Sequence, residues 1–196
     1  MKKQWVQWRL IFLSREKLCA GGMKMVLLLW QFWAYSFVGF LLEKVFAVVT
    51  KAPNQNRRCY LMLPLCPVYG FGVLAVLALP KSMTNTLWGL AIWGGAVATA
   101  VEYAVHWLYE WVLGVRFWDY RGTFGNLQGR VCLPFSLAWS LLLAVGLPPL
   151  HQWLLPLLSL IPPAVTWWML VLFTADALLS SWVLWETGDA EAIRRG

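Results

Sequence analysis

Residues 87–113 form an almost uninterrupted run of apolar and small side chains, and the length of this run limits the folds open to the chain. An α-helix rises about 1.5 Å per residue, so roughly 20 apolar residues cross the ~30 Å hydrocarbon core of a bilayer. The run is therefore predicted to be a membrane-spanning helix. Composition supports this prediction, because 60% of the 196 residues are hydrophobic and only 13% are charged, against about 25% in a typical soluble domain.

Three ionisable residues lie within this run. Glu102, His106 and Glu110 are four positions apart, so their side chains share one face of the predicted helix. A carboxylate at the centre of a membrane helix costs about 2.5 to 3.5 kcal/mol, which makes a functional or pairing role the default interpretation. A proton or cation relay and simple hydrogen bonding between helices both stay open. Metal ligation is less favoured, since one helix rarely supplies a full ligand shell, and no cofactor is expected.

The same pattern along the whole chain predicts an all-α fold, a polytopic transmembrane helical bundle with about five spanning helices. The other predicted spans are residues 25–49, 65–79, 132–147 and 164–185. Residues 148–163 hold an apolar piece between two proline pairs that is too short to cross alone. We expect a re-entrant or interfacial segment there.

The chain divides into three parts. Residues 1–22 place aromatic side chains on one helical stripe among basic residues, which is typical of an amphipathic helix in the headgroup plane. Alternatively, translation starts at Met23 or Met25 and this stretch is a dispensable extension. Residues 23–185 form the predicted transmembrane helical domain, and residues 186–196 form a charged tail.

A weak internal repeat links two helix-to-loop segments. GFLLEKVF (residues 39–46) is similar to HWLYEWVL (residues 106–113), and each is followed by a basic loop and a short helix that opens with Cys and Pro. Short spans interrupted by proline, in corresponding positions of two halves, are typical of a transporter binding site. Chance similarity is an equal alternative. Because two crossings separate the two loops, both are predicted to lie on one face of the membrane.

Acidic and basic residues are predicted to meet at that face. Glu43 and Glu110 lie near the helix ends that lead into the two loops. The arginines of these loops that we predict as site residues are Arg57, Arg58, Arg116 and Arg130. An arginine binds carboxylate or phosphate through its planar fork, so this set could neutralise the acids and lock the helices together, or hold an anionic ligand.

Glu102 lies deeper, where a surface arginine reaches poorly, so we expect a hydrated cavity and a hydrogen bond to His106. Asp176 is near the middle of the last span and is predicted either to pair with a polar residue of another helix or to face water. The remaining candidate site residues are Tyr69 in PVYGFG (residues 67–72), and Asp119 and Asn126 in the loop after residue 113. No catalytic residue is assigned.

The net charge of +7 is concentrated near the N-terminus and in the two loops. Its expected partner is the anionic phospholipid surface of the lipid bilayer rather than nucleic acid. The sequence has no glycine-rich loop followed by Lys and Ser or Thr, so a nucleotide-hydrolysing site would lie on a separate chain. The four cysteines lack metal-ligand spacing and are interpreted as small apolar side chains. Assembly as a homo-oligomer stays open.

Several stretches carry a resemblance to a known family: YSFVGFLLE (35–43), LCPVYGFG (65–72), ATAVEY (98–103) and the most specific, GVRFWDY with GNLQGRVCLPFSLAW (114–139). Residues 23–146 resemble a family of small bacterial membrane proteins described as type IV ABC transporter permeases. The resemblance implies a multi-pass protein of the bacterial cytoplasmic (inner) membrane, working with a separate ATPase or another membrane subunit. It leaves residues 1–22 as an addition, and Pro134 and the Trp-rich C-terminal third depart from the pattern.

Together these patterns favour a transporter-like permease module over an enzyme, with one polar site built from acidic helices and basic loops. Two alternatives stay open. One is an intramembrane enzyme acting on a lipid headgroup, with Glu102 or Glu110 as general base. The other is a membrane scaffold or regulatory subunit, in which single substitutions of the acids would have little effect.

Overall fold

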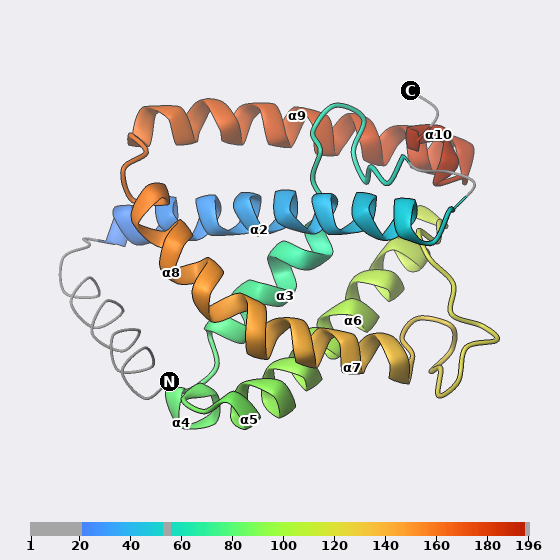
Figure 1. Cartoon of the computed structure of the whole chain (residues 1–196). Coiled ribbons are helices and arrows are strands. Elements are labelled where there is room, and N and C mark those ends of the chain that lie inside the picture. Colours follow the sequence, from blue (N-terminus) through green and yellow to red (C-terminus); the bar gives the residue numbers. More distant parts are fainter. Residues whose placement is uncertain (1–20, 53–55, 195–196) are drawn as a thin grey trace.

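The structure is a computed structural model that describes residues 21–52 and 56–194 of the chain. Within these ranges every regular element is a helix, as the sequence predicts. The helix expected within residues 1–22 lies outside the described residues. The elements of Figure 1 are, in chain order, α2 (Gly21–Val49), α3 (Pro67–Leu77), α4 (Lys81–Thr84), α5 (Leu87–Gly89), η1 (Leu90–Gly94), α6 (Gly95–Leu113), α7 (Leu133–Leu141), η2 (Leu142–Gly146), α8 (Leu147–Leu158), α9 (Pro163–Thr187) and α10 (Glu191–Arg194).

Three helical segments of the described chain are long and apolar enough to cross a membrane. They are Met23–Val49, Leu133–Leu158 and Pro163–Thr187, while Pro67–Leu77 is a shorter apolar helix. The span expected at 87–113 is helical but is not among the three, because its polar residues lower its hydropathy. Length and composition therefore support a membrane protein, and they leave the count of about five spans unconfirmed.

Residues 148–158 do not form the separate re-entrant or interfacial segment that the sequence suggested. α7, η2 and α8 follow one another without a break, so the helix continues from Leu133 to Leu158. Pro148 falls in the first turn of α8, after the π-helical turn η2, where a proline is tolerated. The helix therefore continues past the proline pair, and its path curves from α7 into α8 (Figure 1).

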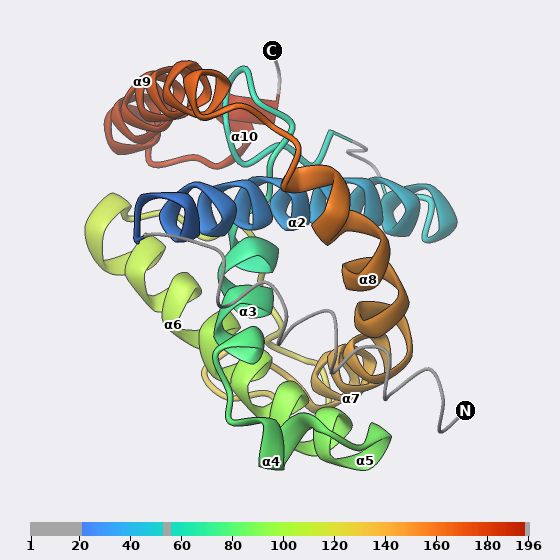
Figure 2. The same ribbon diagram turned by 90° about the vertical axis from the view of Figure 1, so that its left-hand side faces the viewer.

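The helices are arranged around α2. Figure 1 shows α9 beside α2, and Figure 2 shows α3, α6, α7 and α8 on the opposite side of α2 from α9. α2 and α3 approach closely where glycines face the neighbouring helix. A Cβ atom at Gly70 would lie 2.6 Å from the Phe32 carbonyl oxygen, and one at Gly39 would overlap the Tyr69 ring. This close packing of small residues places Tyr69 against α2.

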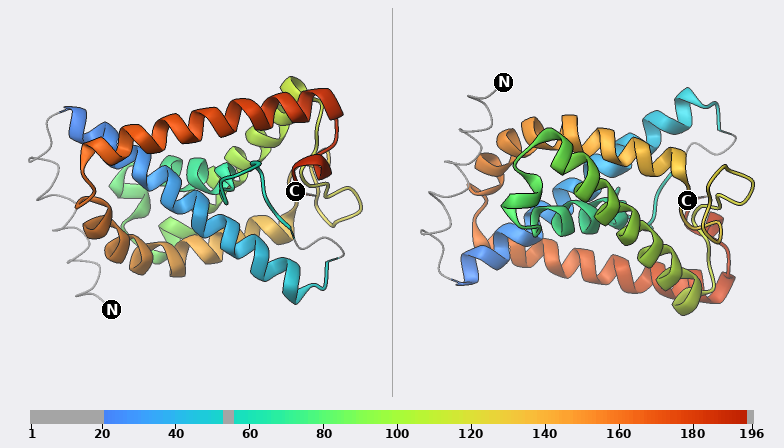
Figure 3. Two further views of the ribbon diagram at one scale, coloured as in Figure 1. Left: turned by 90° about the horizontal axis from the view of Figure 1, so that it is seen from above. Right: turned by 90° about the horizontal axis from the view of Figure 1, so that it is seen from below.

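The segment that enters the bundle without helical structure is residues 56–66. Figures 1 and 3 show it folded between α2 and α9 before α3 begins. Irregular backbone inside a membrane bundle needs hydrogen-bond acceptors from the protein. Asp176, near the middle of α9, accepts from the Met62 amide at 3.1 Å and the Leu63 amide at 2.7 Å, and Ser180 accepts from the Leu61 amide at 3.0 Å. The acid in the last predicted span thus holds this segment in place.

Candidate functional site

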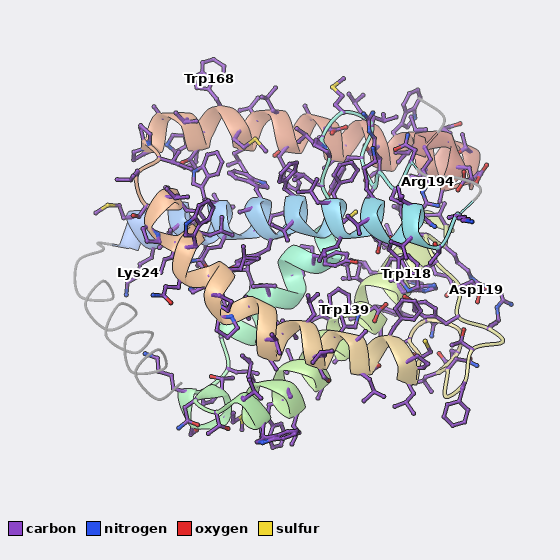
Figure 4. All side chains as sticks on the ribbon, viewed as in Figure 1. Lys24, Trp118, Asp119, Trp139, Trp168 and Arg194 are labelled. Carbon is purple, nitrogen blue, oxygen red and sulfur yellow. The ribbon has the colours of Figure 1, made fainter. Side chains whose placement is uncertain are left out.

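A cavity of about 880 Å³ lies between the C-terminal half of α2, the start of α3, the middle of α6, the loop after α6, and α7 with η2. Figure 4 shows Trp118 and Trp139 in the space between α2 and α7, with Asp119 and Arg194 toward the loop end of the molecule. Among the predicted site residues, those that line the cavity are Glu43, Arg57, Tyr69, Glu102 and Asp119. The fold therefore brings together residues from α2, the segment 56–66, α3, α6 and the loop after α6.

Glu102 is the most deeply buried acid of this cavity, with 4% of its surface exposed. Its Oε1 accepts from the Tyr120 hydroxyl and its Oε2 from the Trp139 indole N–H, each at 2.9 Å. Both donors are neutral, so the described contacts orient the carboxylate without placing a positive charge beside it. A buried carboxylate held in this way can accept a proton or bind a cationic group.

Glu43 is the second acid of the cavity and is half-buried. Its Oε1 accepts from the Tyr69 hydroxyl at 2.8 Å, across the close contact of α2 with α3. We expected an arginine from the loops as partner. In the described residues the structure pairs Glu43 with a neutral hydroxyl instead, because α3 brings Tyr69 against α2 at this point.

His106 does not form the expected hydrogen bond with Glu102 in the described structure. Its Nε2 lies 3.0 Å from the Trp118 carbonyl oxygen, and its ring meets the Trp118 indole edge-on at 5.2 Å between centroids. Its Nδ1 lies 3.9 Å from Glu110 Oε2. His106 thus anchors the loop to α6, and Tyr120 takes the place beside Glu102.

Glu110 lies outside the cavity. It forms the ion pairs with loop arginines that we expected for Glu43 and Glu110, the two acids near helix ends. Arg116 Nε donates to its Oε1 at 2.9 Å, and Arg130 Nη2 donates to its Oε2 at 3.0 Å. Arg130 also donates to the Tyr103 hydroxyl at 2.8 Å. These contacts tie both ends of the loop to α6, which is the helix-locking role.

The loop between α6 and α7 is ordered by its own side chains. Asp119 accepts from the Arg121 guanidinium and amide, and these bonds lower the pKa of Asp119 to about 2. Asn126 donates to the Thr123 carbonyl at 3.0 Å and accepts from the Gly129 amide at 3.2 Å, so it shapes a turn. The ordered loop places the Tyr120 hydroxyl beside the Glu102 carboxylate.

Arg57 and Arg194 both line the cavity. Each has a buried Nε atom that has no hydrogen-bond partner among the described residues. Arg194 is held by Glu191 at 2.9 Å and by the Phe117 carbonyl at 3.2 Å, and its side chain is 10% exposed. Arg58 donates to the Leu61 carbonyl at 3.5 Å and is not among the cavity residues.

Sequence reasoning did not identify Tyr120, Trp139 and Arg194 as residues of the cavity. Tyr120 and Trp139 belong to the specific block GVRFWDY to LAW. Aromatic residues are frequent in this Trp-rich chain, so nothing in the sequence distinguishes these two as cavity residues. Arg194 lies in the charged tail, where no sequence signal marks it. Among the described residues, no group of three or more His, Cys, Asp or Glu side chains is placed to hold a metal ion.

The three apolar helices of membrane-spanning length in the described chain define its class as a membrane protein. The profile of the family described as "Putative ABC-transporter type IV" matches residues 30–181, and the chain belongs to this family. The match includes most of the Trp-rich C-terminal third. No curated protein and no solved structure matches the chain.

Proposed function

We propose that the chain is a permease module whose substrate binds in the cavity between α2, α6 and α7. The observation that carries this proposal is the pair of carboxylates in the cavity, Glu43 and Glu102, which accept hydrogen bonds only from neutral donors within the described contacts. Maintaining acids in this state inside a helical bundle is costly. Since the chain belongs to a transporter family, binding of a transported substrate would explain why these acids are kept.

We propose about five crossings of a bacterial cytoplasmic membrane. In Figure 1, α2, α6 and α9 run in one direction across the molecule, while α3 and the α7–α8 helix run in the other. This alternation is what successive crossings produce. The short helix α3, of 11 residues, completes its crossing together with the irregular segment 56–66 that precedes it.

In this proposal the predicted site residues other than Arg58 separate into two groups. Glu43, Glu102, Tyr69 and Arg57 contact the substrate, since they line the cavity. The positioning residues are His106, Glu110, Arg116, Asn126, Arg130 and Asp176, which hold the loops that shape it. Asp119 lines the cavity but is bound to Arg121, so it belongs to both groups.

We propose that the energy for transport comes from an ATPase on a separate chain, because this sequence has no phosphate-binding loop. Anionic phospholipids would contact the basic loops. Purification of the intact chain from its own membrane in mild detergent, followed by mass spectrometry, tests the ATPase. A co-purifying ATPase supports the proposal, and a chain that transports without any partner contradicts this part.

The central experiment compares cells that lack the chain with cells that express it, by profiling small molecules inside and outside. Glu102→Gln and Glu43→Gln are expected to match the deletion at wild-type levels of membrane-inserted protein. The exposed Glu186→Gln at the end of α9 is the matched control and is expected to match wild type. Full transport activity of Glu102→Gln would contradict the proposal that the substrate binds in this cavity.

An intramembrane enzyme acting on lipid headgroups is the second candidate, because the cavity combines acids with apolar walls. Here Glu102 would act as general base. Formation of a defined lipid product by the purified chain alone would favour this candidate over transport. A scaffold subunit predicts the opposite pattern, in which Glu43→Gln and Glu102→Gln both retain full function.

A further inference from the structure

One wall of the cavity is apolar and faces outward. Val45, Phe46 and Val49 on α2, and Leu141, Leu142 and Val145 on the α7–η2 helix, line the cavity and are all exposed. Both helices belong to the segments able to span a membrane. Exposed apolar side chains on helices of this kind are suited to contact with lipid acyl chains, so this wall suits a lateral opening toward the hydrocarbon region.

The contact between α2 and α7 at this opening is an aromatic pair. Phe46 and Phe135 meet edge to face with ring centroids 5.8 Å apart, and both line the cavity. Beyond the apolar area that it buries, an edge-to-face pair of this kind is a weak contact. An alkyl chain could replace one of its partners at small cost, because it would bury similar apolar surface.

The inner wall suits a positively charged nitrogen group. Glu43 and Glu102 line it, and among the described residues neither forms an ion pair, whereas Glu110 outside the cavity binds two arginines. Aromatic rings surround the two acids: Tyr69 and Trp139 lie 4.8 Å apart between centroids, and Tyr120 stacks on Phe135 at 4.9 Å. Acids combined with aromatic faces attract organic ammonium groups.

The arginines of the cavity suit an anion. Arg57 and Arg194 both line the cavity, and each has a buried Nε without a hydrogen-bond partner among the described residues. Arg194 is already fixed by Glu191 and the Phe117 carbonyl, so little side-chain entropy remains to be lost on binding. Guanidinium groups bind phosphate through charge-assisted hydrogen bonds.

We propose that the cavity binds a zwitterionic amphiphile of the aminophospholipid class. Its ammonium lies beside Glu43 and Glu102, its phosphate beside Arg57 and Arg194, and its alkyl chain leaves between α2 and α7. This inference rests on the proposed function, since it names the substrate class of the same site. A single ligand of this kind satisfies both acids, both arginines and the apolar wall.

The test uses the intact purified chain in a neutral detergent and measures binding of three probes. Lysophosphatidylethanolamine carries ammonium, phosphate and tail, lysophosphatidic acid lacks the ammonium, and phosphoethanolamine lacks the tail. We expect the first probe to bind at least about tenfold more tightly than either of the others, since each lost group removes one set of contacts. Equal binding of all three would overturn the proposal.

Variants assign each contact to its part of the probe. Glu43→Gln and Glu102→Gln are expected to weaken lysophosphatidylethanolamine by about tenfold and to leave lysophosphatidic acid unchanged. Arg57→Gln is expected to weaken both lipids, while Arg58→Gln, next to it but outside the cavity, is the matched control and leaves both unchanged. Loss in the control equal to loss in Arg57→Gln would indicate general attraction to the basic surface and overturn the phosphate site.

A variant of the apolar wall keeps the test independent of the charged residues. Val145→Trp fills the exposed side of the cavity without removing a polar contact. It is expected to weaken binding of the two probes that carry a tail and to leave phosphoethanolamine unchanged. Unchanged binding would overturn the exit path between α2 and α7. If Glu102→Gln abolishes transport in cells while no lipid probe binds, the substrate class falls and the transport proposal stands. If that variant also transports normally, both fall.

Discussion

Asp176 on α9 and Glu102 on α6 are both carboxylates buried near the middle of a helix, but their surroundings differ. Asp176 accepts from the backbone amides of Met62 and Leu63 and from the Ser180 hydroxyl. Glu102 accepts from two side chains, Tyr120 and Trp139, and lines a cavity. The first acid closes a gap in the backbone hydrogen bonding of the fold, and the second faces space that a ligand can occupy.

This difference separates stability from function. Removing Asp176 leaves buried backbone amides without acceptors, which costs the full desolvation of each group. Removing the charge of Glu102 leaves two side-chain donors beside a cavity, where water or another rotamer can satisfy them. Acids of the same depth and burial are therefore expected to respond to substitution in opposite ways.

Asp176→Ala is expected to have the largest effect on stability. It leaves the amides of Met62 and Leu63 unpaired, so unfolding in detergent should become easier by about 3 kcal/mol or more. Asp176→Asn keeps one acceptor oxygen, so its stability should lie between those of Asp176→Ala and wild type. Thermal unfolding followed by size-exclusion chromatography measures both. A melting temperature equal to wild type for Asp176→Ala would break the comparison.

Ser180→Ala is expected to show the same effect at smaller size. It removes the acceptor of the Leu61 amide and one partner of Asp176, and should cost about 1 kcal/mol. Ser181→Ala, at the next position of α9, is the matched control. The same unfolding measurement applies. If both serine variants lose equal stability, the loss reflects the helix rather than the segment 56–66.

Glu110→Gln is expected to lower the melting temperature less than Asp176→Ala does. It breaks the ion pairs with Arg116 and Arg130, which hold the loop but lie at the surface of the molecule. Because exposed ion pairs are screened, the difference from wild type should shrink as salt rises toward about 1 M. A difference that does not depend on salt would indicate that Glu110 acts through something other than these pairs.

Glu102→Gln is expected to have the smallest effect on stability and the clearest effect on function. Its melting temperature should stay close to wild type, within about 1 kcal/mol of unfolding free energy, while transport is lost. Parallel measurement of folded protein and of activity in cells checks this. A loss of stability as large as that of Asp176→Ala would show that Glu102, like Asp176, is needed for folding. The difference proposed between the two acids would then be wrong.

Much of the fold could be predicted from the sequence. The runs at 25–49 and 164–185 correspond to α2 and α9 within a few residues, because length and apolarity alone specify a membrane helix. The proline pair at 148 was misinterpreted as a boundary. A proline in the first turn of a helix and a proline that ends one look alike in sequence, and only the backbone path distinguishes them.

Part of the lining of the cavity was predicted from the sequence. Glu43, Glu102, Tyr69, Arg57 and Asp119 do line one cavity. Which arginine meets which acid could not be predicted, because arginines on the same loop reach different helices according to how the loop folds. Arg116 and Arg130 reach Glu110, while the cavity receives an arginine from the C-terminal tail.

The sequence by itself determined that the chain is a helical membrane protein with costly acids inside it, since hydrophobic length and charge are properties of each segment alone. Only the tertiary structure decided which acid holds backbone and which faces a cavity. Asp176 and Glu102 are both mid-helix acids in the sequence, and the backbone amides that donate to Asp176 lie 113 and 114 positions away in the chain. Contacts over such separations depend on packing, which no local pattern encodes.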